Sequence, residues 1–225
     1  MSHRPHSPVP KKLEPIRQQV LRMGHLAEAI LEKALRSVSE RSVGLAGEVA
    51  ADDLAIDQLD VDIDRAVLEF LALQAPVAQD LREVIAIKTA ATDLERVGDI
   101  ARNIAKSALR LNELAAISPP SRLEVLADAS RRALLNAVVA FANYDSVLAR
   151  AVLASDDQID ADEEEIFRSA LHEIRSNPDS SEQEVYFMLI AKNLERVGDH
   201  ATNIAEEVIL VVESLNLKHA EKLIQ

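Results

Sequence analysis

LERVGDIARNIA at residues 94–105 returns one hundred residues later as LERVGDHATNIA at residues 194–205. The two copies differ only at Ile100/His200 and Arg102/Thr202. A shared helical pattern explains why Leu, Val, Ile and Ala recur, but it does not explain why Glu, Arg, Gly, Asp and Asn return at the same offsets. The repeat therefore indicates two similar halves, each of which keeps the same polar groups in place.

The composition favours packed helices over strands. Hydrophobic residues make up 48% of the 225 residues but aromatic residues only 3%, so the core must consist of Leu, Ile, Val and Ala. Five glycines and eight prolines leave little turn chemistry for a many-stranded fold. We therefore expect an all-α protein.

The formal charge of −13 opposes binding to nucleic acid or to an anionic membrane surface, since both attract clustered Lys and Arg. Cations and basic protein surfaces remain as partners. The absence of cysteine excludes disulfides and thiolate metal sites. No apolar run is long enough to span a membrane or to act as a signal peptide, so we expect a cytoplasmic protein without direct membrane insertion.

Apolar spacing predicts six helices after a flexible tail at residues 1–12. In the first half we expect a helix from Leu13 to a break at residues 42–47, a second helix to about Leu73 and a third from Pro76 to about Leu114. In the second half we expect helices at about residues 122–152, 155–176 and 180–217. These six helices predict two tandem antiparallel three-helix bundles, at residues 13–116 and 121–217. The bundles would be related by a pseudo-twofold internal repeat and would pack end to end or side by side. A single longer bundle is the alternative.

The repeated motif carries a polar column beside its apolar face. Residues four apart on a helix lie one above the other, so Glu95, Asp99 and Asn103 align, and Glu195, Asp199 and Asn203 form the second copy. Glycine in the middle of a helix costs about 1 kcal/mol relative to alanine. Gly98 and Gly198 therefore indicate that a neighbouring helix comes too close for a Cβ atom.

The second helix of each half supplies a second acidic stripe. The first half has Asp53, Asp57, Asp60 and Asp64, and the second half has Asp156, Asp160 and Glu163. Two such stripes brought together repel each other unless a positive charge lies between them. Carboxylate and amide oxygens suit a hard cation such as Mg, Ca, Mn or Fe, and nothing favours zinc. The alternative is a pair of solvated acidic faces with Arg96 and Arg196 as ion-pair partners.

The doubled Leu-Glu-Arg-Val-Gly-Asp motif, each time followed by Asn-Ile-Ala and preceded by an acidic helix, closely resembles the PhoU family of phosphate-transport accessory and regulatory proteins. The resemblance extends through residues 74–77 and 80–82 and covers nearly all of the chain after the tail. It implies two three-helix bundles and metal sites, with iron as the metal and Mn, Mg or Ca as other candidates. Carried over by position, the ligands are Asp53, Asp57, Glu95 and Asp99, and then Asp156, Asp160, Glu195 and Asp199.

The same resemblance implies negative control of the phosphate-starvation response (the Pho regulon) and no catalysed reaction. The expected partners are the ATPase subunit of the phosphate ABC transporter and a sensor histidine kinase, through which the chain would lie at the periphery of the inner membrane. A homodimer is also expected.

Two positions depart from the family pattern. Asp156-Asp157 leaves the first ligand of the second half ambiguous, and His200 is interpreted as a surface residue or an extra ligand.

Two other functions fit part of the sequence. A di-metal carboxylate enzyme of the ferritin-like type also places carboxylates in a helical bundle, but no His in this sequence lies three residues after a Glu. A plain acidic scaffold that docks basic partners would need no metal. Metal analysis distinguishes the scaffold from the other two.

Overall fold

The structure, a computed structural model, describes residues 13–217, which are helical and contain no strand. The first half consists of α1 (Glu14–Ser39), α2 (Val43–Gln74) and α3 (Ala78–Glu113). The second half consists of α4 (Ser121–Asn143), α5 (Ser146–Leu153), α6 (Asp156–Ser176), the short 3-10 helix η1 (Pro178–Ser180) and α7 (Ser181–Glu213). The expected tail at residues 1–12 lies outside the described residues.

The same turn chemistry begins the second helix of both halves. Arg41 has a φ of 48°, in the left-handed region, and the Ser42 side chain accepts a hydrogen bond from a backbone amide in the first turn of α2. Tyr144, with a φ of 53°, and Asp145 occupy these two places before α5. Asp145 Oδ1 accepts hydrogen bonds from two amides in the first turn of that helix, each at 3.0 Å. The internal repeat therefore extends to the turns.

This turn corrects the predicted helix at residues 122–152. The prediction was wrong at its C-terminal end, because α4 stops at Asn143 and residues 146–153 already belong to the next helix. The left-handed backbone of Tyr144 ends the first helix, and the Asp145 cap begins another. Counted as two segments of one broken helix, α5 and α6 stand where α2 stands in the first half, and the expected six helices are confirmed.

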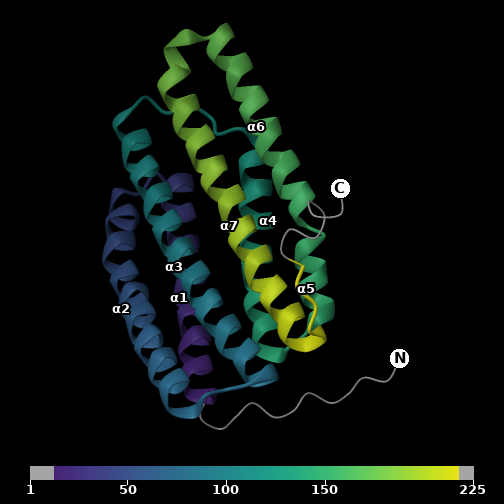
Figure 1. The fold of residues 1–225 in the computed structure, drawn as a ribbon. Helices are drawn as coiled ribbons and strands as arrows, with labels where there is room; N and C mark the ends of the chain where they lie inside the picture. The colour runs from purple at the N-terminus through teal and green to yellow at the C-terminus, as the bar shows by residue number, and fades with distance from the viewer. Residues whose placement is uncertain (1–12, 218–225) are drawn as a thin grey trace.

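The two three-helix bundles pack side by side, with α3 against α7 at the centre of the molecule (Figure 1). Figure 1 shows α2, α3, α7 and α6 across the front, with α1 behind α3 and α4 behind α7. The central helices run in opposite directions. We call the line along which α2 packs against α3 the α2–α3 seam, and the line along which α6 packs against α7 the α6–α7 seam. The first seam lies on one side of the molecule and the second on the other.

The core is aliphatic, as the composition predicted. Burying one such side chain contributes about 1.5–3 kcal/mol, so long helices with regular apolar faces can hold the bundle without aromatic residues. The apolar residues of the repeated motif all face inward. The largest fully buried side chains are Leu13, Met23, Leu31, Ile56, Ile63, Ile87, Leu94, Ile100, Ile104, Leu126, Leu134 and Ile159. Across residues 13–217, no helix has the length and apolar character that crossing a membrane requires.

Candidate metal centres

Two glycines of the repeated motif allow a neighbouring helix to pack closely. A Cβ added at Gly98 would collide with Asp53 Oδ1 on α2. A Cβ at Gly198 would lie 3.0 Å from Ile159 Cδ1 and 3.6 Å from Asp156 Oδ1, both on α6. The predicted close approach of a helix is therefore confirmed in both halves, and it brings an aspartate of the second helix next to the motif.

In the first half, Arg102 lies between the carboxylates of two helices. Its Nη1 is 2.8 Å from Asp53 Oδ2 on α2, and its Nη2 donates to Asp99 Oδ1 on α3 at 2.5 Å. The Asp53 side chain is only 1% exposed. Glu95 stands one turn before Asp99 and also contacts Arg96, at 3.5 Å. The predicted meeting of the two acidic stripes is present, with a guanidinium between them.

A second cation lies further along the same seam. Lys88 Nζ on α3 is 3.5 Å from Asp60 Oδ1 and also forms an ion pair with Asp64. Each of these two aspartates has a buried oxygen without a hydrogen-bond partner. Lys88 and Arg102 therefore place positive charge at two points along the acidic seam of the first half.

The second half has the same carboxylates but a different cation. Asp156 stands against Gly198 as Asp53 stands against Gly98, whereas Asp157 is exposed, so Asp156 is the counterpart of Asp53. Lys192 Nζ lies 2.9 Å from Glu195 Oε1 and 3.7 Å from a carboxylate oxygen of Glu163 on α6. Asp156 Oδ1 and Glu195 Oε2 are buried without a hydrogen-bond partner. The inner end of this site therefore has unpaired oxygens.

The electrostatics of the two halves differ accordingly. Burial raises the pKa of Asp53, and the positive charge of Arg102 partly offsets that rise. Burial also raises the pKa of Asp156, to about 6, and its further causes are repulsion from Asp160, Asp199, Asp157 and Glu195. No cation is among these main causes of the raised pKa of Asp156. Negative charge is therefore less well compensated in the second half.

Other carboxylates at these seams are also easier to protonate than usual. Burial, and then the charge of Asp99, raises the pKa of Glu95. Burial, and then Glu195 and Asp160, raises the pKa of Asp199. Asp57 stands close enough to Asp53 and Glu95 to raise the pKa of both. All eight sequence-predicted residues therefore lie along the two seams.

These residues have the chemistry of a hard-cation site without a finished coordination shell. Across residues 13–217, no three His, Asp or Glu side chains already surround a common point as ligands. The buried orphan oxygens of Asp156 and Glu195 fit a cation such as Mg, Mn or Fe, which binds oxygen donors. In the first half, Asp53 Oδ2 and Asp99 Oδ1 already lie against Arg102, whereas Asp53 Oδ1 is buried without a hydrogen-bond partner.

Sequence reasoning missed the cations of these sites. It treated Arg102 only as a difference between the repeats, although its position three residues after Asp99 already predicts a contact on the same helix. Lys192 likewise stands three residues before Glu195 on the same helix, which predicts their contact. The contacts of Lys88 with Asp60 and Asp64 and of Lys192 with Glu163 cross between two helices and follow only from the packing of those helices.

His200 and Asn203 face the central interface between the two halves. His200 Nδ1 lies 2.8 Å from Asp93 Oδ1 on α3, and Asn203 Nδ2 donates to the same oxygen at 3.0 Å. The interpretation of His200 as a surface residue was wrong, because its side chain is 17% exposed and joins α7 to α3. Asn203 likewise turns away from the column predicted with Glu195 and Asp199. This contact has no counterpart around Ile100.

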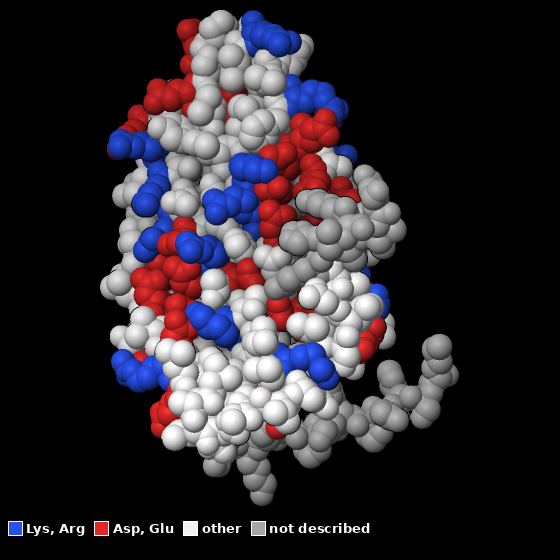
Figure 2. All heavy atoms as spheres, in the orientation of Figure 1, with Lys and Arg blue, Asp and Glu red and all other residues white. Residues whose placement is uncertain are grey.

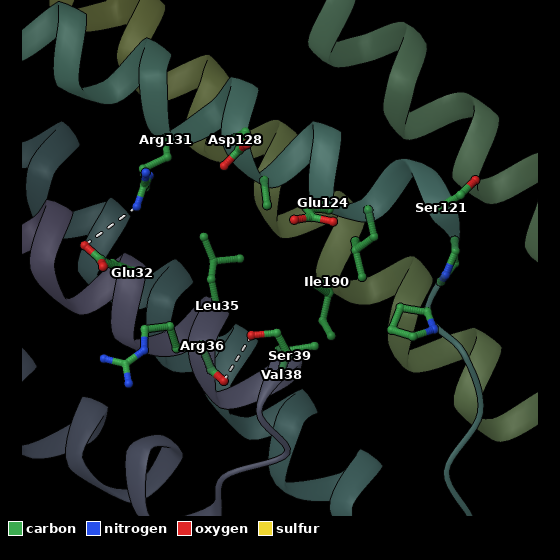
Figure 3. A pocket seen from close by; sticks show the side chains of 14 residues that line it. Glu32, Leu35, Arg36, Val38, Ser39, Ser121, Glu124, Asp128, Arg131 and Ile190 are labelled. Atoms are coloured by element: carbon green, nitrogen blue, oxygen red, sulfur yellow. Dashed lines mark hydrogen bonds and ion pairs between the residues drawn. The ribbon is translucent and has the colours of Figure 1, made fainter.

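A groove of about 440 Å³ lies between α1 and α4, away from the acidic seams. Figure 3 shows Leu35 and Ile190 at its centre, with an ion pair of 3.7 Å between Arg131 and Glu32 across one end. Apolar residues and mixed charges line this groove. It offers a surface for contact with another molecule but not a set of metal ligands.

The acidic seams appear on the molecular surface as two separate areas, one over α2 and α3 and the other over α6 and α7 (Figure 2). The fold and the sites together define a class of protein: an all-α protein with an internal repeat and one acidic seam in each half. The PhoU domain model matches residues 20–108 and 123–208, which fall in the two halves. The chain belongs to the PhoU family.

Relatives and solved structures agree with this assignment. The phosphate-specific transport system accessory protein PhoU homolog of Xylella fastidiosa is 37% identical over 194 residues, which cover 86% of this chain and 82% of that protein. The Pseudomonas putida homolog is 35% identical over 210 residues, which cover 92% of this chain and 82% of that protein. The crystal structure of PhoU from Pseudomonas aeruginosa matches with a TM-score of 0.87 at 33% identity, over 91% of this chain and 98% of that chain. The crystal structure of the phosphate transport system regulatory protein PhoU from Streptococcus pneumoniae matches with a TM-score of 0.84 at 27% identity. The match covers 91% of this chain and 97% of that chain.

Proposed function

We propose that this chain is an accessory protein of a phosphate-specific transport system and that it regulates phosphate uptake. The names of its relatives support this role, and the similarity covers both halves of the chain. The proposal includes no reaction catalysed by the chain itself. It acts through partners, and the groove and the acidic surface are available for such contacts.

The finer proposal is that the chain is a cytoplasmic negative regulator. It links the ATPase subunit of the phosphate transporter to a sensor histidine kinase and keeps the phosphate-starvation response repressed when phosphate is abundant. The resemblance to the family supports this assignment, which is an argument by analogy. Deleting the gene in its host tests it, since phosphatase expression should then rise in high phosphate. Expression that stays repressed would overturn the regulatory role.

We further propose that this chain binds a hard metal cation at its seam carboxylates. The observation that carries this proposal is the facing of carboxylates from two helices, with orphan buried oxygens on Asp156 and Glu195. A divalent cation would supply the positive charge that these carboxylates lack. Asp156 and Asp160 on α6 and Glu195 and Asp199 on α7 would hold it in the second half. Iron follows from the resemblance, and Mn, Mg and Ca suit the same oxygens.

Metal analysis of protein purified without chelator tests this proposal directly. We expect bound metal and a melting temperature that falls when EDTA removes it. A plain acidic scaffold predicts neither result. A di-metal enzyme predicts both, but in addition a turnover of oxygen or substrate that the proposed regulator does not have.

The proposed assembly is a homodimer that pairs the outer faces of two α2 helices. Leu54, Val61 and Leu68 are exposed there at intervals of seven residues, the spacing of helices that pair. An antiparallel pair centred on Val61 would place Leu54 of one copy opposite Leu68 of the other, and Arg65 opposite Asp57. The matching positions of α6 are the acidic residues 157 and 164 followed by Leu171, so the fold itself does not require this stripe.

A further inference from the structure

Position 102 and its repeat, position 202, treat the neighbouring carboxylates in opposite ways. Arg102 reaches across the seam and contacts Asp53 on α2 while it also holds Asp99 on its own helix. Thr202 donates its hydroxyl to the backbone oxygen of Asp199 at 2.7 Å, so its side chain stays on α7. One half therefore brings its own cation to the seam from this position, and the other half does not.

The contact between Arg102 and Asp53 resists replacement. The Asp53 side chain is 1% exposed, and a buried carboxylate that loses its partner is strongly destabilising. Arg102 also contacts Asp99, so its guanidinium is held at two points with different nitrogen atoms. A metal ion at these oxygens would have to displace a cation that the chain already supplies.

In the described part of the second half, no cation of the chain stands beside Asp156, the counterpart of Asp53. Among residues 13–217, no Lys, Arg or His nitrogen lies within 4.0 Å of an Asp156 oxygen, and Asp156 Oδ1 is buried without a hydrogen bond. Lys192 uses the outer oxygen of Glu195, which leaves Oε2 without a hydrogen-bond partner. In the first half, Asp53 Oδ1 is likewise buried without a hydrogen bond, but Arg102 Nη1 lies 2.8 Å from Oδ2 of the same carboxylate, and Asp60 and Asp64 pair with Lys88. The two sites therefore differ in what their inner oxygens still need.

We propose that the Arg102 guanidinium is the resident cation of the first acidic seam, so that metal binding by this chain is confined to the second half. This inference rests on the cation binding proposed above, and it adds which half binds and which residue decides. The duplicated motif thus holds two kinds of site. One is closed by an arginine of the chain, and the other takes its cation from solution.

An exchange of the two residues tests this assignment in the full chain. We compare the wild type with Arg102→Thr, Thr202→Arg and the double exchange. Each protein is stripped of metal, incubated with Mn²⁺ and dialysed, and bound manganese is counted by emission spectroscopy and located by anomalous diffraction. Arg110→Thr is the matched control, because Arg110 lies on the same helix and pairs with the exposed Glu113 at 3.0 Å. Circular dichroism verifies that each variant is folded.

Each of the three exchange variants is expected to differ from the wild type in its manganese pattern. The wild type and Arg110→Thr hold manganese in the second half only. Arg102→Thr adds manganese in the first half, which raises the content about twofold, and Thr202→Arg lowers the content to about a tenth or less. The double exchange moves the metal to the first half. In metal-free protein, Arg102→Thr also lowers the melting temperature, because it leaves Asp53 buried without its partner.

The outcomes separate the two proposals. Manganese in both halves of the wild type, or no gain in Arg102→Thr when the wild type is loaded, overturns the inference alone. If neither the wild type nor Arg102→Thr binds manganese, the cation binding of the proposed function is overturned, and the inference falls with it. A melting temperature of metal-free Arg102→Thr equal to that of the wild type overturns the role of Arg102 as resident cation, whatever the metal content.

Discussion

His200 Nδ1 on α7 lies 2.8 Å from Asp93 Oδ1 on α3, and this contact joins the two halves of the molecule at their shared interface. Asn203 donates to the same oxygen. At the matching position of the first motif the residue is Ile100, which is buried in the apolar core. The repeat therefore provides one polar clamp between its halves instead of two.

Removing this clamp should destabilise the fold. Asp93→Ala leaves His200 and Asn203 without their acceptor at a half-buried interface, and we expect a loss of about 1–3 kcal/mol. Asp93→Asn copies the residue at position 193 and keeps an acceptor oxygen, so its loss should be smaller. Thermal unfolding measures both. Asn103→Ala is the control, because Asn103 is exposed, and an equal loss there would contradict a specific role for the clamp.

Alanine at Gly98 should also destabilise the protein. Its Cβ would collide with Asp53, which cannot move away without breaking its ion pair with Arg102, so we expect a loss of about 1–3 kcal/mol. Gly47→Ala is the matched control on α2, because nothing lies within 4 Å of the added atom. It should instead stabilise by about 0.5–1 kcal/mol. Chemical denaturation gives both values, and equal effects would refute the close approach at Gly98.

The metal-free protein should be less stable at neutral than at mildly acidic pH. Because the pKa of Asp156 is raised to about 6, the folded chain keeps a proton that the unfolded chain, with its usual 3.8, has released. This contribution is complete below about pH 4 and disappears as the pH rises through 6. After allowance for solvent screening, we expect about 1–2 kcal/mol. The raised pKa values of Asp53, Asp160 and Asp199 act in the same direction.

Melting of chelator-treated protein at about pH 5.5 and pH 7.5 measures this dependence. Asp156→Asn should flatten it, because an amide does not titrate and removes one of the mutually repelling charges. A wild-type protein that melts higher at pH 7.5, or a variant with an unchanged profile, would count against the uncompensated charge at Asp156.

Loss of a proposed ligand should reduce metal content without unfolding the chain. Asp199→Ala removes a carboxylate at the edge of the α6–α7 seam, outside the apolar core, so helix content should stay near that of the wild type. Bound metal should fall about tenfold or more, because even the loss of a residue that only supports a direct ligand typically costs about 10–100-fold in metal affinity. Glu164→Ala is the control, since this exposed residue of α6 pairs with Arg168 instead. Equal metal content in the two variants would remove Asp199 from the site.

A charge in the apolar stripe of α2 should dissociate the proposed dimer. Val61 is 53% exposed, so Val61→Glu costs the monomer little, but it would place two like charges together at the centre of an antiparallel pair. Light scattering should report a dimer for the wild type and a monomer for the variant. Val147→Glu, at an exposed position on α5, should leave the mass unchanged. A wild-type chain that is monomeric would rule out the pairing.

The sequence predicted much of the site because helical spacing is local. The stacking of Glu95 with Asp99, the burial of the apolar face and the close approach at Gly98 and Gly198 all follow from 3.6 residues per turn and the absence of a Cβ atom. The largest boundary error, at Asn143, depended on a left-handed residue between two segments that both have a helical pattern. Smaller errors are the break predicted at residues 42–47, which lies at residues 40–42, and the last helix, which ends at Glu213 and not at residue 217. The sequence Asn-Tyr-Asp-Ser at residues 143–146 contains that signal, because Asn, Asp and Ser favour turns and caps.

The sequence by itself determined that this chain is all-α, that it is duplicated and that each half carries two acidic stripes, because these properties depend on the order of residues along one helix. Only the tertiary structure decided which charges meet. Arg102 reaches Asp53, Lys88 reaches Asp60, and His200 reaches Asp93, each across the gap between two helices. Such pairings depend on the rotation and offset of packed helices, which no local pattern specifies.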